Sequence, residues 1–310
     1  MIPAHDRRLM LVHAHPDDET IGNGVTMARV VAEGGRVTLV TCTLGEEGEV
    51  LVPELVHLDA EHEDALAPQR LAELTDAMRL LGVTDFVRLG GDGRYRDSGM
   101  AYDDKGRAIA RDVLRDGIFW TADLLEAAND LVTVIRDRRP QVLVAYNEMG
   151  GYGHPDHVQA HRVATYGYLL AGVPGYRPDL GEPWTVARVV WSTMSASRMG
   201  AMIAQLRAAG DTETFAGWED AGDDLPMVSS DADIAAAVDG TAYVAQKLDA
   251  MRAHGTQIRP DGTFFAGGKM SVDTMWSHEF YRFAAGVPFP QKPDGPDGAV
   301  WADDLFAGLD

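Results

Sequence analysis

The chain has 310 residues, and its 48 acidic and 27 basic residues give it a formal net charge of −21 at pH 7. We therefore expect no binding to nucleic acid or to a membrane surface, because both carry negative charge and would repel the protein. Apolar runs are too short to span a bilayer and the first residues lack a signal-peptide pattern, so we expect a cytoplasmic protein. The single Cys42 excludes an internal disulfide and a cysteine-based zinc site, which leaves histidine and carboxylate side chains to hold any metal.

The first part of the chain predicts a strand, helix, strand unit. Residues 9–14 form a short apolar run typical of a buried parallel strand, residues 20–33 have helical periodicity, and residues 36–42 are rich in β-branched side chains. The connection in such a unit is right-handed, and functional loops lie beyond the carboxyl ends of the strands. His15 directly follows the first predicted strand and therefore falls at this edge.

The same alternation continues further along the chain. It predicts helices over 66–81 and from Thr121 to 135, and strands over 85–89, 141–146 and 186–191. We predict a Rossmann-like α/β fold with a doubly wound, mostly parallel sheet, helices on both faces and a C-terminal extension. Without a repeat or linker, the pattern favours one domain over 1–310, with a catalytic core at about 8–192 and a part at about 193–310 that completes the substrate site.

The remaining segments have weaker patterns. We predict a long loop over the site at 94–118, helices near 195–209 and 239–254, an acidic loop at 217–233 and a Pro/Gly-rich segment at 286–298.

Two short polar motifs concentrate imidazole and carboxylate groups at the same predicted sheet edge. One runs from His15 to Glu19, and the other is His154-Pro155-Asp156-His157. His15, Asp18 and His157 supply two histidines and one carboxylate, which suits catalytic zinc with one open position, and Fe²⁺ would fit the same ligands. Asp17 then remains beside the metal as a general base for its water. Each motif alone would be better explained as a helix-capping acidic loop with an exposed histidine, and only their pairing favours a site.

These motifs also carry a family resemblance. Residues 12–19 and 150–157 are similar to the PIG-L/LmbE-like zinc N-deacetylases, and further similarity in 41–49, 93–100 and 253–257 extends it over most of 8–285. The resemblance implies a Rossmann-like fold and zinc held by the same His15, Asp18 and His157 that the spacing selects.

Within the family, the motifs most resemble the N-acetylglucosaminyl-inositol deacetylases of mycothiol biosynthesis, and next the mycothiol S-conjugate amidases. Gly22 and Gly153 stand where the amidases tend to carry Lys and Pro, which favours hydrolysis of an acetamide on a small N-acetyl amino sugar. Conjugate amidase activity and deacetylation of another N-acetyl sugar stay as alternatives. Asn147 departs from the Asp usual in the family, at the rim of the predicted site.

The leaving amine and the developing oxyanion need their own partners. We expect Asp156 to hold His154 charged and oriented, so that His154 stabilises the oxyanion or protonates the amine, as the resemblance also implies. Tyr152 is a candidate donor to the oxyanion, although an ordinary aromatic residue covering the crevice fits the sequence equally well.

Sugar hydroxyls require paired hydrogen-bonding groups such as one arginine and one aspartate. By family position these are Arg70 and Asp97, and weaker candidates for the polyol end are Glu49 and Gln257. Without the resemblance, a helix-face arginine, a turn cap and structural roles would explain these four residues.

Two other function classes compete with a deacetylase. A nucleotide-binding dehydrogenase fits the sheet pattern, but Gly22 and Gly24 begin a glycine fingerprint whose third position is Met27. A non-catalytic, metal-containing sugar-binding protein is the second, and the redundant carboxylate of Asp17 speaks against it. Turnover of an N-acetyl sugar discriminates between them, and the sequence does not indicate an oligomeric state.

Overall fold

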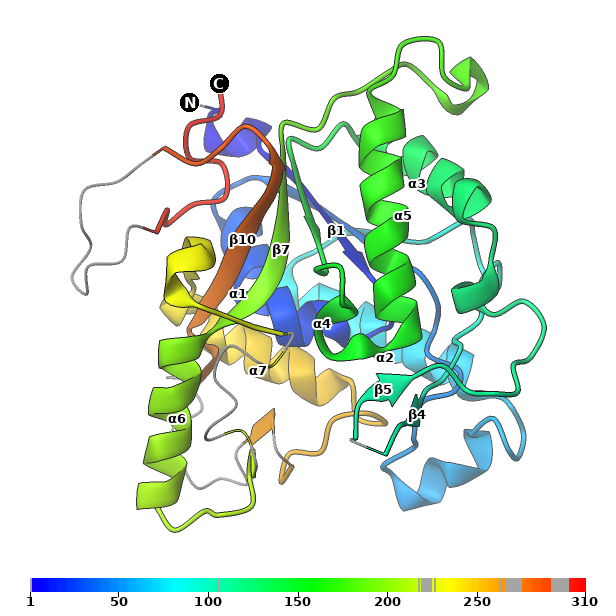
Figure 1. The fold of residues 1–310 in the computed structure, drawn as a ribbon, viewed down its shortest axis with the longest axis vertical. Helices are drawn as coiled ribbons and strands as arrows, with labels where there is room; N and C mark the ends of the chain where they lie inside the picture. The colour runs from blue at the N-terminus through cyan, green and yellow to red at the C-terminus, as the bar shows by residue number, and fades with distance from the viewer. Residues whose placement is uncertain are drawn as a thin grey trace.

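A mostly parallel sheet forms the centre of the molecule, which a computed structural model describes for residues 2–104, 106–216, 218, 225, 227–262, 264–265, 275–290 and 301–310 (Figure 1). Its strands are β1 (Arg8–His13), β2 (Arg36–Thr41), β3 (Asp85–Arg88), β6 (Val142–Ala145), β7 (Arg188–Ser195), β8 (Val228–Ser229), β9 (Ile234–Asp239) and β10 (His278–Gly286). The order is β3-β2-β1-β6-β7-β10-β9, with β8 paired to β7. β10 runs antiparallel to both β7 and β9, whereas the other pairs are parallel.

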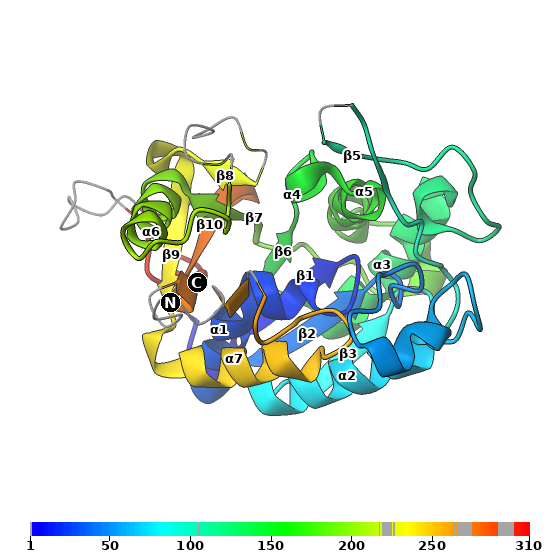
Figure 2. The same cartoon turned by 90° about the horizontal axis from the view of Figure 1, so that it is seen from below.

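Helices cover both faces of the sheet, which confirms the predicted Rossmann-like α/β fold (Figure 2). One face carries α1 (Asp18–Ala32), α2 (Leu66–Leu81) and α7 (Val244–Ala253), and the other carries α3 (Leu124–Arg138) and α5 (Pro155–Ala171). The short α4 (Gly150–Gly153) precedes α5, and α6 (Ala196–Ala208) follows β7. Short 3-10 turns occur at η1 (Ala4–Asp6), η2 (Pro53–Leu58), η3 (Phe119–Thr121), η4 (Pro178–Leu180), η6 (Asp231–Asp233) and η7 (Thr241–Tyr243). Among the described helices, none combines the length and the apolar character that a membrane span needs.

The central strand β1 supplies side chains to two separate cores. Because side chains alternate along a strand, Leu11 packs into the cluster that contains Met27 of α1, whereas Met10 and Val12 pack with Leu131 of α3. All of these side chains are buried. The continuous apolar run in the sequence therefore reflects burial on both faces of the sheet.

Truncating this strand at its centre should destabilise the protein. We expect Leu11→Ala to lower the free energy of unfolding by about 2–5 kcal/mol, because the surrounding core leaves a cavity where the side chain was. Leu125→Ala on α3 is the matched control, since Leu125 is 51% exposed and its loss should cost less than about 0.5 kcal/mol. Urea unfolding of both variants measures the difference, and equal midpoints would contradict the assignment of Leu11 to the core.

Some predicted elements differ from the structure. α3 begins later than expected, because the side chain of Asp123, and not that of Thr121, caps it by accepting a hydrogen bond from the Glu126 amide. The expected loop at 94–118 contains a hairpin of β4 (Ala101–Tyr102) and β5 (Ala108–Ile109). The segment expected to be an acidic loop, 217–233, includes β8 and η6, and some of its other residues lie outside the described part of the chain, as do 291–298 of the predicted Pro/Gly-rich segment.

The order of strands places the two polar motifs together. The chain lays β2 and β3 on one side of β1 and β6 and β7 on the other, so β1 and β6 are neighbours at the point where the winding reverses. Ligand sites in such sheets lie beyond the carboxyl ends of the strands at this switch point. His15 follows β1 and His154 follows β6, so both motifs lie at this switch point.

Candidate metal centre

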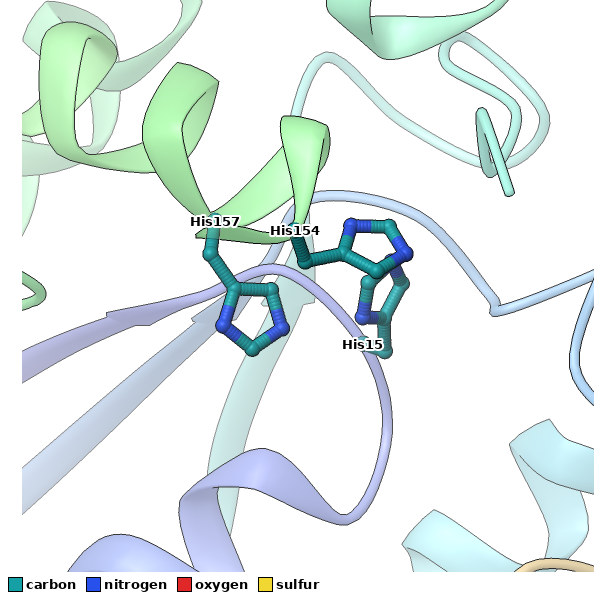
Figure 3. Close-up of side chains that lie close together, drawn as sticks. All are labelled: His15, His154 and His157. Atoms are coloured by element: carbon teal, nitrogen blue, oxygen red, sulfur yellow. The ribbon is translucent and has the colours of Figure 1, made fainter. Parts of the chain in front are cut away.

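Three buried histidines from two distant segments converge beyond the carboxyl ends of β1 and β6. Figure 3 shows His154 and His157 at the start of α5, facing His15 on the loop that follows β1. Each ring offers a nitrogen that lies within 4.8 Å of a nitrogen of the other two. The convergence that the sequence predicted for these motifs is therefore present in the structure.

Local rules of helix formation place the second motif. Pro155 occupies the first turn of α5, and His154 is its N-cap, with its Nδ1 accepting a hydrogen bond from the Asp156 amide at 3.1 Å. His157 follows in the first turn. The second motif thus begins α5 and directs the imidazole groups of His154 and His157 toward His15.

The loop after β1 holds Asp17 in an unusual backbone conformation. Its φ of 111° lies in a region that side-chain-bearing residues rarely adopt, at a cost of about 1–3 kcal/mol. The Asp17 amide donates to Oε2 of Glu19 at 3.0 Å, and Oε1 of Glu19 lies 3.3 Å from Nε2 of His254. Glu19 and His254 are both fully buried, so a packed polar pair from distant segments supports the strained turn.

The carboxylate of Asp18 lies between the two histidines that were predicted to share a metal with it. Its Oδ2 is 3.4 Å from Nδ1 of His15 and 3.3 Å from Nε2 of His157. Two ligand atoms of a tetrahedral zinc ion are separated by about 3.4 Å. Nε2 of His157 is buried and has no hydrogen-bond partner among the described residues. These residues therefore fit a divalent ion.

Two further carboxylates bind the other side of the His15 ring. Nε2 of His15 lies 3.2 Å from Oδ2 of Asp156 and 3.4 Å from Oδ1 of Asp97. A carboxylate on one ring nitrogen fixes the proton there and leaves the other nitrogen free to coordinate. Nδ1 of His15 is consequently the atom presented to Asp18.

Alternative triplets of potential ligands also exist around His15. His15, His154 and His157 form one, and His15, Asp97 and Asp156 form another. In the second, Asp156 already accepts hydrogen bonds from the amide and hydroxyl of Ser98, and in the first, Nδ1 of His154 caps α5, so that His154 could coordinate only through Nε2. The set with Asp18 leaves these contacts intact.

The expected contact between Asp156 and His154 is wrong. The Asp156 carboxylate bonds to His15 and Ser98, and His154 receives only the Asp156 amide, because the helix start turns the carboxylate away from its neighbour. The surroundings also favour a neutral His154 over the expected charged one. Burial and the adjacent His15 and His157 rings lower the pKa of His154 to about 2, so this side chain is neutral near pH 7.

The two consecutive aspartates differ in their electrostatics. Burial raises the pKa of Asp17 to about 6, although Arg70 opposes the shift and its Nη2 lies 3.3 Å from Oδ2 of Asp17. Burial would also raise the pKa of Asp18, but the His157 and His15 rings outweigh it and hold this pKa well below its usual value. Asp18 is therefore a permanent anion, whereas Asp17 can exchange a proton in the neutral range.

The residues expected to bind sugar surround this centre. Arg70 is buried, and it donates to the carbonyl oxygens of Pro16 and Gly45 while its Nε has no partner among the described residues. Gly45 has a φ of +66°, and a Cβ there would lie 1.8 Å from Nη1 of Arg70, so only glycine allows this approach. Asp97 is buried and accepts from the amides of Glu47 and Gly99.

The weaker candidates lie further out. Glu49 is exposed, and Nε2 of Gln257 donates to its backbone oxygen at 3.1 Å, which brings the C-terminal part of the chain to the loop after β2. Tyr152 is 39% exposed, and the edge of its ring faces His157 with the centroids 4.9 Å apart. Tyr152 therefore lies over a predicted ligand.

Several buried partners of the centre were not identified from the sequence. Glu19 and His254 were within motifs that had been recognised but had no assigned role, and a charged side chain directly before an apolar helix was the available signal for Glu19. Ser98 was within a recognised motif but had no assigned role, and Asn23 and Tyr146 were not identified because their contacts join segments far apart in the sequence.

Comparisons with known proteins identify relatives along most of the chain. The PIG-L family, described as GlcNAc-PI de-N-acetylase, matches residues 10–166. A protein of Nocardioides sp. named 1D-myo-inositol 2-acetamido-2-deoxy-alpha-D-glucopyranoside deacetylase is 55% identical over 304 residues, which cover 98% of this chain and 99% of that one. A protein of the same name from Kribbella flavida is 54% identical, with 98% of each chain covered.

A solved structure with the same fold is the N,N'-diacetylchitobiose deacetylase of Pyrococcus horikoshii. It superposes with a TM-score of 0.57 at 20% identity and covers 91% of this chain and 85% of that one. At this identity the likeness shows the fold alone.

Proposed function

Because the chain belongs to the PIG-L family of GlcNAc-PI de-N-acetylases, we propose that it hydrolyses the acetamide of 1D-myo-inositol 2-acetamido-2-deoxy-α-D-glucopyranoside to the free amine and acetate. Full-length relatives that bear this deacetylase name support the substrate, which places the reaction in mycothiol biosynthesis. The observation that carries the chemistry is the Asp18 carboxylate oxygen, 3.3–3.4 Å from one nitrogen of His15 and one of His157.

We assign His15, Asp18 and His157 as the residues that hold a divalent ion, with zinc as the proposed metal and Fe²⁺ as the alternative. Nitrogen and carboxylate ligands in this number suit a catalytic zinc site with an open position. A divalent ion bound there supplies Lewis acidity, which acidifies a water molecule and polarises the acyl oxygen. Asp97 and Asp156 keep the proton of His15 on Nε2 and so keep Nδ1 available.

Proton transfer is assigned to Asp17. With a pKa of about 6, its carboxylate is mostly ionised near pH 7 and can accept a proton from the attacking water. His154 is neutral, and since its Nδ1 accepts from the Asp156 amide, its Nε2 carries the proton and can donate to the developing oxyanion. The hydroxyl of Tyr152, whose ring contacts that of His157, is the second proposed donor to the oxyanion.

Sugar binding is proposed for the residues around this centre. Nε of Arg70, which has no partner among the described residues, is proposed to donate to a sugar hydroxyl group, and Asp97 to accept from the adjacent hydroxyl. Glu49 and Gln257 are proposed for the polyol end, and the contact between them supports a single domain over 1–310 whose C-terminal part completes the substrate site.

The experiment compares two substrates of the metal-loaded protein. We expect kcat/KM for the acetylated glucosaminyl-inositol to exceed that for a mycothiol S-conjugate by about tenfold or more, because Gly22 offers no side-chain partner for the polar atoms of the larger acyl group. Release of free amine measures both reactions. Faster conjugate cleavage would replace the deacetylase assignment with the amidase, and saturable binding without turnover would favour the non-catalytic sugar-binding protein.

A further inference from the structure

A buried histidine that is not a candidate ligand lies directly behind the metal centre. His13, the last residue of β1, is enclosed by polar groups at both ring nitrogens. Its Nε2 lies 2.8 Å from Oδ1 of Asn23, and its Nδ1 lies 3.0 Å from the hydroxyl of Tyr146. The amide of Ala14 donates to the same hydroxyl at 3.1 Å.

The partners of Asn23 determine the direction of these hydrogen bonds. Nδ2 of Asn23 donates to the hydroxyls of Tyr281 at 2.9 Å and Ser192 at 3.0 Å, so Oδ1 is the atom that faces His13. An amide oxygen only accepts, and His13 therefore carries a proton on Nε2. In the neutral ring Nδ1 then accepts from Tyr146, whose hydroxyl is engaged both as donor and as acceptor.

Tyr146 links these hydrogen bonds to a proposed metal ligand, His157. Its ring stacks on the imidazole of His157, with centroids 4.4 Å apart and planes inclined by 22°. The network of hydrogen bonds reaches the ligands through this stacked pair of rings.

The far end of the network is held by the C-terminal part of the chain. Tyr281 of β10 accepts from Asn23 and donates to Oγ1 of Thr26 at 2.7 Å. Two residues earlier, the buried Glu279 accepts from the amides of Val25 and Thr26 and from Nζ of Lys247. These hydrogen bonds join β10 to the part of α1 that contains Asn23.

We propose that Asn23, His13 and Tyr146 form a positioning relay, anchored by Tyr281 of β10, that sets the plane of the His157 ring. The relay rests on the proposed metal centre at His15, Asp18 and His157. Its members touch neither substrate nor metal, and they act through the ligands. Hydrogen bonds to the surroundings of metal ligands typically change metal affinity by about 10- to 100-fold.

The test uses Tyr146→Phe, which keeps the stacked ring and removes the hydroxyl. Its matched control is Tyr95→Phe, because Tyr95 is also buried and its hydroxyl donates to Asp130 at 2.7 Å, away from the ligands. Zinc affinity is measured by competition with a chelator, and the coordination geometry by the visible absorption of the cobalt-substituted protein. We expect Tyr146→Phe to weaken zinc binding by about 10- to 100-fold and to alter the cobalt spectrum, with both readouts unchanged in Tyr95→Phe.

Asn23 supplies a second, independent pair of variants should Tyr146→Phe fail to fold. Asn23→Asp keeps an acceptor for His13 and should retain the cobalt spectrum, whereas Asn23→Leu removes the acceptor and should change it. Wild-type affinity and spectrum in Tyr146→Phe or in Asn23→Leu would overturn the relay while leaving the metal centre in place. Failure of the unmodified protein to bind zinc or cobalt would instead overturn the proposed centre itself.

Discussion

His157→Ala is expected to bind divalent metal more than about 100-fold more weakly than the unmodified protein and to lose its deacetylase activity. Removing the ring leaves His15 and Asp18 as the remaining proposed ligands, and loss of a ligand should exceed the 10- to 100-fold effect typical of groups behind the ligands. Metal content after dialysis against a weak chelator measures the effect. His62→Ala is the matched control, because that histidine is exposed and pairs with Asp59.

The same measurement of metal content also distinguishes the proposed ligand set from the alternative triplets. Asp18→Asn should empty the site, whereas His154→Ala should retain metal, since His154 is not in the proposed set. Full occupancy in Asp18→Asn together with loss in His154→Ala would replace the proposed set with the three histidines.

Asp17→Asn is expected to keep its metal and to lower kcat by about 10²- to 10⁴-fold. The amide has the size of the carboxylate but cannot accept the proton of the attacking water, and general-base catalysis typically contributes this factor. Amine release at saturating substrate, with metal content measured on the same samples, separates this loss from loss of the ion. Asp76→Asn on α2 is the control, because its side chain is exposed and lies beside Arg79.

A near-normal kcat in Asp17→Asn would assign proton acceptance to another group. His154 is the first alternative to test, because its ring lies 4.6 Å from that of His15 and 5.2 Å from that of His157, centroid to centroid. Combining Asp17→Asn with His154→Ala would then reveal whether the two side chains share the role.

The sequence predicted the parallel part of the fold and the meeting of the two motifs because both follow from local patterns. The apolar run of β1 indicated a strand buried on both faces, and parallel strands necessarily end at one edge. β10 was not predicted, because what makes it a strand is its pairing with β7 and β9, which come from elsewhere in the chain. Strand propensity depends strongly on such neighbours.

The partner of Asp156 and the charge of His154 also depend on tertiary contacts that the sequence does not reveal. Asp156 is two residues from His154 and was an obvious partner, yet the first turn of α5 directs its carboxylate to His15. The neutral state of His154 results from burial beside two other imidazoles, one of them brought from the loop after β1. Spacing along the chain identifies which groups meet but not which of their atoms face one another.

The central position of β10 has a consequence for the order in which the protein is completed during synthesis. β10 fills the place between β7 and β9, so until residues 278–286 leave the ribosome both strands have an unpaired edge. The hydrogen bond from Asn23 to Tyr281 also cannot form until then, because Tyr281 follows Asn23 by 258 residues. Contacts of such long range form late and leave the incomplete chain exposed to aggregation. The nascent protein is therefore expected to gain its full affinity for metal only after this strand has closed the sheet.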